Sequence, residues 1–255
     1  MKTNNSNKKI TKVSEGASEN VQSRTFVPTD EAKGKANRLR LIAIISWVVA
    51  VAAQLVAISL LFKDPINMTW LIVLIVVDLI FVVIGSILWK KSNRLDPASE
   101  ENKFKFFMQN QLGLVVAIIA FLPLIILIFT NKNMDGKQKG IVGGIAVLAL
   151  LIAGVTGIDF NPPSIEQYTE QTNKVEWLNQ GANNVYWTKS GTVYHLFIDC
   201  SYINTAKTSE IFEGTVAQSR ELKNITNLCS RCENKAIKER NLDEAEYNTD
   251  PELTD

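Results

Sequence analysis

Four long apolar runs dominate the middle of the chain. They carry almost no charge, and each has 19 to 22 residues: 41–62, 70–89, 112–130 and 140–158. At about 1.5 Å per residue in a helix, this length matches a hydrocarbon layer of about 30 Å. The first run starts too late and is too long for a cleavable signal peptide. The pattern therefore predicts a domain of four transmembrane helices over residues 39–158.

The flanks of this apolar region are polar. Residues 1–38 are rich in Asn, Ser, Lys and Thr, and residues 241–255 are acidic. Neither segment has the apolar periodicity that a packed core requires, so we expect a disordered basic N-terminal segment and a disordered acidic tail. Between the second and third runs, Asp96 followed by Pro97 predicts the N-cap of a helix that leads into the third span.

Residues 159–181 predict a connecting helix. Ser164 and Gln167 have the spacing of a capping box, and apolar residues follow at helical intervals as far as Gly181. Two short β-prone runs come next, 185–188 and 192–195, joined by a turn that contains glycine. This pattern is typical of a β-hairpin.

The remainder of residues 182–240 predicts two short helices. One follows a capping box formed by Thr215 and Gln218, and the other begins near Cys232. Together with the hairpin they form a small α+β module. The predicted fold class is an α-helical membrane protein with four transmembrane helices and a small C-terminal α+β zinc-binding domain, for the reasons given below.

Charge changes sign along the chain, although 27 basic residues nearly balance 26 acidic ones overall. Residues 1–40 carry 9 basic and 4 acidic side chains, whereas residues 159–255 carry 9 basic and 16 acidic ones. Basic residues precede the first run and separate the second from the third, which favours the cytoplasm for these links. We therefore expect a multi-pass protein of the cell membrane with both termini in the cytoplasm. The acidic C-terminal part argues against nucleic acid as a partner.

The one histidine and the three cysteines of the chain all fall in the small module. They are His195, Cys200, Cys229 and Cys232, in the pattern His-x4-Cys followed by Cys-x2-Cys. Zinc prefers four nitrogen and sulfur ligands in a tetrahedron, and such paired spacings supply two ligands from each tight turn. The sequence predicts that these four residues bind zinc. Two alternatives stay open: free cysteines buried as small apolar residues, and a disulfide between Cys229 and Cys232.

The residues from Val185 to His195, with the cysteines that follow them, resemble a small Ada-like zinc-binding module. Similar modules occur at the ends of bacterial membrane proteins and of some secreted nucleases. The resemblance covers roughly 50 residues, does not reach the four runs, and implies that His195 and the three cysteines are the zinc ligands. In the Ada repair protein the ligands are all cysteine and one thiolate accepts a methyl group from DNA phosphate. Here a histidine is among the ligands and the module is acidic, so we do not expect that activity.

The number of ligands favours a structural role for zinc. A catalytic zinc ordinarily has three protein ligands and an open position for water, whereas this pattern supplies four ligands. A module of this size has a small core, and zinc would contribute to its folding free energy. The sequence contains no glycine-rich phosphate loop and no Ser/His/Asp arrangement. We therefore expect that the chain is not an enzyme.

Asp78 is a carboxylate in the middle of the second apolar run. Such residues are costly within a bilayer and often mark a proton or ion pathway. The alternative is a role in helix packing, and Gln54 of the first run is placed at the same depth by its distance from the intervening turn. We expect Asp78 and Gln54 to form an intramembrane polar pair. Small residues spaced by four, such as Gly140 and Gly144, predict close helix approach.

These observations predict a membrane protein whose cytoplasmic module, stabilised by zinc, is a binding or scaffolding unit. One alternative is a zinc or redox sensor that signals through Cys229 and Cys232, and another is a small transporter centred on Asp78. The expected partners are the lipid bilayer and a cytoplasmic protein, with a second copy of the chain as a further candidate.

Overall fold

The computed structural model describes residues 8–13, 25–223, 225–243, 245 and 247. The chain divides into two compact units. One contains residues 33–163, and the other combines residues 1–32 with residues 164–255. Each unit is described by itself below.

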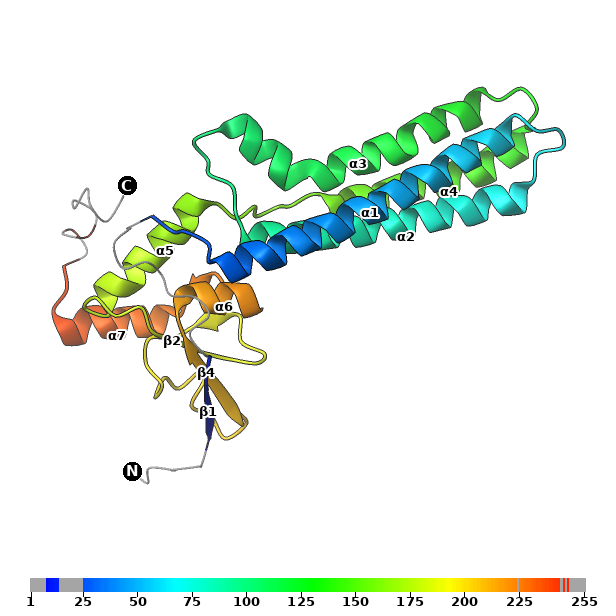
Figure 1. Cartoon of the computed structure of the whole chain (residues 1–255). Coiled ribbons are helices and arrows are strands. Elements are labelled where there is room, and N and C mark those ends of the chain that lie inside the picture. Colours follow the sequence, from blue (N-terminus) through cyan, green and yellow to red (C-terminus); the bar gives the residue numbers. More distant parts are fainter. Residues whose placement is uncertain (1–7, 14–24, 224, 244, 246, 248–255) are drawn as a thin grey trace. The chain divides into compact units, whose positions relative to one another are not determined.

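The helical unit consists of long helices that coincide with the four apolar runs (Figure 1). Their bounds are α1 Asp30–Leu61, α2 Met68–Leu95, α3 Lys103–Thr130 and α4 Gly136–Gly157. Among the described residues, these four helices are long and apolar enough to cross a membrane. The prediction of four apolar helices is confirmed, and each helix extends several residues beyond its apolar run into polar sequence.

Helices α2, α3 and α4 pack closely on one another, and glycine makes the tightest of these contacts possible. A Cβ atom on Gly157 would lie 2.6 Å from the carbonyl carbon of Gly113, so the backbones of α3 and α4 touch at this point. Gly143 admits the ring of Phe129 in the same way. The predicted close approach at Gly140 and Gly144 is wrong, because both glycines face open space. Spacing alone does not say which small residues face a neighbouring helix.

The link between α2 and α3 also differs from the prediction. Asp96 is the residue at which α2 ends, and the side chain of Asn102 caps α3 by accepting from the amide of Lys105. The carboxylate of Asp96 instead accepts a hydrogen bond of 2.6 Å from the guanidinium of Arg40 on α1. An ion pair across the unit has replaced the local cap that the dipeptide Asp96-Pro97 predicts.

The second unit is built around a small sheet. Its strands are β1 Lys9–Lys12, β4 Glu210–Gly214 and β2 Val185–Thr188, paired in the order β1-β4-β2. A further pair joins β3 Val193–Tyr194 to β5 Asn227–Leu228 in parallel. The helices are α5 Ile165–Leu178, α6 Val216–Lys223 and α7 Ser230–Arg240.

The local predictions for this unit are mostly confirmed. Ser164 caps α5, and Thr215 and Gln218 form the expected reciprocal cap of α6. The hairpin is present where Tyr186 and His195 exchange two backbone hydrogen bonds of 2.7 Å. Beyond that pair its two arms diverge, because β2 joins β4 while β3 joins β5.

The expected disorder of residues 1–38 is wrong for the residues that the structure describes. Strand β1 pairs in parallel with β4, and ion pairs connect Lys9 to Glu210 and Lys12 to Glu213. Helix α1 begins at Asp30, ahead of the predicted boundary. Composition does not reveal this order, because β1 buries little of itself and depends on the edge that β4 offers.

The predicted boundary between a connecting helix and a separate module is also wrong. Val175 and Leu178 of α5 are fully buried in the same core as Trp187 and Tyr194. Arg240 at the end of α7 donates hydrogen bonds to the carbonyl of Leu178 and to the side chain of Asn179. Helix α5 is therefore part of the C-terminal fold.

Within the predicted tail, residues 244, 246 and 248–255 lie outside the described residues. Tyr247, which the structure describes, is buried and packs its ring 4.9 Å from that of Trp177. At this position the expectation of disorder is wrong, because an aromatic contact with α5 holds the chain.

Candidate metal centre

His195 is fixed by the backbone on both of its sides. Its amide and carbonyl pair with Tyr186, and the preceding residue, Tyr194, pairs with Leu228 in the short parallel ladder. The carbonyl of Tyr194 also accepts a hydrogen bond of 2.9 Å from the amide of Cys229. The same ladder that orients His195 therefore brings Cys229 beside it.

Cys200 lies in a tight loop that follows the histidine. Its amide donates to the carbonyl of Phe197, and its own carbonyl accepts from the amides of Ile203 and Asn204 at 3.0 and 2.8 Å. These short-range hydrogen bonds turn the chain back, so that the Cys200 sulfur faces the histidine.

Cys229 and Cys232 are placed by the start of α7. Cys229 is the N-cap residue and Cys232 lies in the first turn, which puts both sulfurs at the same end of the helix. The N-terminus of a helix carries a partial positive charge that favours thiolates. The Cys-x2-Cys spacing thus places one candidate ligand at the N-cap position of α7 and the other in its first turn.

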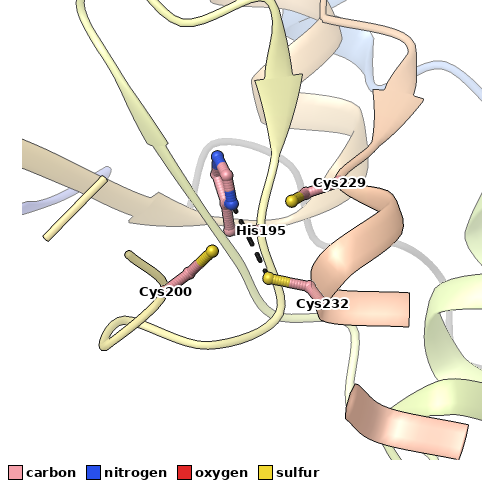
Figure 2. Close-up of side chains that lie close together, drawn as sticks. All are labelled: His195, Cys200, Cys229 and Cys232. Atoms are coloured by element: carbon pink, nitrogen blue, oxygen red, sulfur yellow. Dashed lines mark hydrogen bonds between the residues drawn. The ribbon is translucent and has the colours of Figure 1, made fainter. Parts of the chain in front are cut away.

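The four side chains converge on one point, as Figure 2 shows. One ligand atom from each of His195, Cys200, Cys229 and Cys232 lies within 4.8 Å of all the others. The Nδ1 atom of His195 is 3.6 Å from the sulfur of Cys232. In a tetrahedron with bonds of about 2.0 to 2.3 Å, ligand atoms are roughly 3.3 to 3.8 Å apart, so a small contraction would complete the geometry. The predicted grouping of these four residues is confirmed, and together they could hold a metal ion.

Burial shifts the pKa of two groups of the site, His195 and Cys232. All four residues are buried. Burial lowers the pKa of His195 to about 4, so its imidazole is neutral near pH 7 and can offer a lone pair. Burial raises the pKa of the Cys232 thiol to about 12, although backbone hydrogen bonds from Phe197 and Leu196 act in the opposite direction. A metal ion would therefore have to displace a proton from this thiol.

The cysteines are free thiols rather than a disulfide in this structure. They also belong to the core itself, in contact with a cluster that includes Trp187, Tyr194 and Ile203. All four residues are buried, and four protein donors match the ligand number of a closed structural zinc site. Its chemistry fits a cross-link between the hairpin, the loop and α7.

Residues outside the ligand set hold the loop against α7, and the sequence pattern does not reveal them. Lys235 of α7 pairs with Asp199 at 3.2 Å and lies 4.1 Å from the centre of the Phe197 ring. Both contacts lie on the segment just before Cys200. Their separation in sequence, 36 residues for Lys235 and Asp199, gives no periodic signal.

The predicted intramembrane pair is not formed. The amide of Gln54 donates a hydrogen bond of 3.1 Å to the backbone carbonyl of Ile119 on α3. Asp78 is 1% exposed, and no described residue donates a hydrogen bond to either of its carboxylate oxygens. Equal depth in two spans therefore did not imply contact, because Gln54 faces α3 rather than Asp78.

No protein-family model, curated protein or solved structure matches this chain. The resemblance to Ada-like modules stays a prediction.

Proposed function

We propose that this chain is a multi-pass protein of the cell membrane whose cytoplasmic unit is held together by one structural zinc ion. We propose further that this unit binds or scaffolds a cytoplasmic protein. The observation that carries the proposal is the convergence of four buried ligand atoms within 4.8 Å of one another. One nitrogen and three sulfurs form a donor set that suits zinc, and four protein ligands suit a closed structural site.

The arrangement of the second unit supports a common side for both ends of the chain. Strand β1, which precedes the four long helices, pairs with β4, which follows them. The two segments share one folded unit, so they lie on one face of the membrane. The concentration of basic residues around α1 and between α2 and α3 favours the cytoplasm for that face.

The loop that contains Cys200 supports a binding role. Tyr202 is 67% exposed and Ile198 is 36% exposed, while Cys200 between them is buried with the other ligands. A bound metal ion would hold this loop rigid and present two apolar side chains to solvent. Exposed aromatic residues on a preorganised loop are typical of protein contacts.

The burial of all three cysteines favours this structural role over redox sensing. Sensor thiols are accessible and have a depressed pKa, whereas burial raises the pKa of Cys232.

The test uses the full-length chain in detergent and in cells. Metal analysis should find about one zinc per chain, and a photo-crosslinking residue at position 202 should yield a protein adduct in cells. The same residue at exposed position 222 on α6 is the control and should give no such adduct. A purified chain without bound metal would contradict the zinc proposal. A zinc-loaded chain that forms no adduct from position 202 would contradict the binding role alone.

A second function is favoured by a separate observation, the buried carboxylate of Asp78. A carboxylate that no described residue hydrogen-bonds, in a helix able to cross a membrane, suits a proton or cation pathway. Proteoliposomes with an internal pH-sensitive dye test this alternative. Proton flux that is lost in Asp78→Asn would support it, and equal flux in wild type and variant would dismiss it.

A further inference from the structure

Two cavities follow one another along the same faces of α1 and α3. The first, of about 500 Å³, lies near the start of α3 and is bordered by Arg40, Trp89 and Lys105. The second, of about 330 Å³, is bordered entirely by apolar groups, among them Trp47, Val48 and Ile119. The rings of Trp47 and Trp89 lie 5.4 Å apart, which makes the two cavities adjacent.

The helices leave this groove open for a structural reason. The backbones of α2, α3 and α4 approach one another closely, whereas the backbone of α1 lies farther from all three. On α1 the residues that border the groove recur at helical spacing, from Arg40 through Ile44 and Val48 to Val51. On α3 they run from Lys105 through Leu112 to Ile119.

The polar end of the groove carries a net positive charge. The guanidinium of Arg40 donates to the side chain of Asp96 at 2.6 Å and to its carbonyl at 2.9 Å. The ammonium of Lys105 is exposed and pairs with no acidic residue in the described part of the chain. Two cations and one carboxylate leave one positive charge, which complements the single negative charge of a phosphodiester. Because Asp96 fixes the guanidinium, Arg40 is preorganised, and two of its five N–H groups are used.

The apolar end has the dimensions of a lipid chain. From Arg40 to Val51 the helix rises about 17 Å at 1.5 Å per residue. One leaflet of a bilayer provides about 15 Å of hydrocarbon. The charged end lies beside Trp89 and Phe104, and aromatic residues of this kind settle at the headgroup layer.

We propose that the groove between α1 and α3 binds one phospholipid with an anionic phosphodiester headgroup. Lys105 and Arg40 bind the phosphate, and an acyl chain lies along Val48 and Ile119. A zwitterionic lipid has a cationic group beside its phosphate, so it balances the positive charge of the groove less well and should bind more weakly. The proposal does not depend on the metal centre.

The experiment is native mass spectrometry of the full-length chain in detergent, titrated with phosphatidylglycerol or phosphatidylcholine of identical acyl chains. The wild type should bind one phosphatidylglycerol in preference to phosphatidylcholine. Lys105→Gln should weaken phosphatidylglycerol binding about fivefold, the effect of one cation near an anionic headgroup. Lys103→Gln removes an equivalent exposed charge that borders neither cavity, and should change the affinity by less than about twofold.

Variants in the apolar end separate a lipid from a free phosphate. Val48→Trp should fill the groove and abolish binding, whereas Ile45→Trp, at an exposed neighbouring position outside the groove, should leave it intact. Glycerol phosphate, which has the headgroup chemistry without acyl chains, should not displace the lipid at equal concentration.

Equal binding of the two lipids would overturn the proposal. The proposal would also be overturned, in favour of a free phosphate, if glycerol phosphate displaced the lipid completely and Val48→Trp left lipid binding unchanged. If Val48→Trp does not fold, the test is the ratio of the phosphatidylglycerol affinities of Lys105→Gln and Lys103→Gln. Equal losses of affinity in the two variants would also overturn the proposal.

Discussion

The amide of Phe26 donates a hydrogen bond of 2.8 Å to the side-chain oxygen of Thr169. This bond joins the segment that enters the first long helix to α5, which follows the fourth. The ring of Phe26 also lies edge-on against Tyr168, with 5.2 Å between the ring centres. The segment before α1 and helix α5 are therefore joined in one fold by a hydrogen bond and an aromatic contact.

The guanidinium of Arg220 lies beside both aromatic rings of this contact. Arg220 is 1% exposed, its guanidinium lies 4.0 Å from the centre of the Tyr168 ring, and it donates to the Tyr168 carbonyl at 3.1 Å. Arg220→Met should destabilise the unit by about 2 to 4 kcal/mol, because a buried carbonyl loses a charged donor. Pulse proteolysis of the full chain in urea measures this change. Lys223→Met, exposed on the same helix, should cost less than about 0.5 kcal/mol, and equal effects would show that Arg220 has no special role.

Substitution of a candidate metal ligand should release zinc, whereas substitution of its neighbour should not. Cys232→Ser removes one of four ligands, and we expect bound zinc to fall from about one to below about half an equivalent per chain. Limited proteolysis should then cut the segment between His195 and Cys232. Ser230→Ala, which changes an exposed residue of the same helix turn, should keep both the metal and the protection. A Cys232→Ser chain that retains a full equivalent of zinc would contradict the assignment.

Two glycines of α4 should respond oppositely to the same change. Gly157→Ala places a Cβ atom 2.6 Å from the Gly113 backbone, which cannot move aside easily, and should cost about 1 to 3 kcal/mol. Gly144→Ala meets open space and should be neutral or stabilising by up to about 1 kcal/mol, because alanine favours the helix. Thermal unfolding of the full chain in detergent tests the pair. A loss at position 144 as large as that at 157 would contradict the described packing of α3 on α4.

Gln54 and Asp78 should behave as independent sites. Since Gln54 bonds to Ile119, a double-mutant cycle of Gln54→Leu and Asp78→Asn should give a coupling below about 0.5 kcal/mol. The measurement is the thermal stability in detergent of the wild type, the two single variants and the double variant. A coupling above about 1 kcal/mol would restore the direct pair that equal depth predicts.

Periodicity and ligand spacing were enough to predict the long helices and the grouping of the four candidate metal ligands. An apolar run of 19 to 22 residues has one stable form in a hydrocarbon layer, because each backbone polar group must be satisfied within the run. The pattern of His195, Cys200, Cys229 and Cys232 is equally restrictive, since short spacings place paired ligands in single turns. Caps such as Thr215 with Gln218 are local as well, and they too were readable.

Only the tertiary structure decided which distant residues meet. Asp96 has the local chemistry of a helix cap, yet its carboxylate pairs with Arg40, 56 residues away, because the ion pair lies within reach once α1 and α2 are folded. Strand β1 has no core of its own and is ordered by the free edge of β4. Gln54 faces α3 because helix rotation is set by packing across the whole unit, and a sequence shows depth along a span but not the direction in which a side chain points.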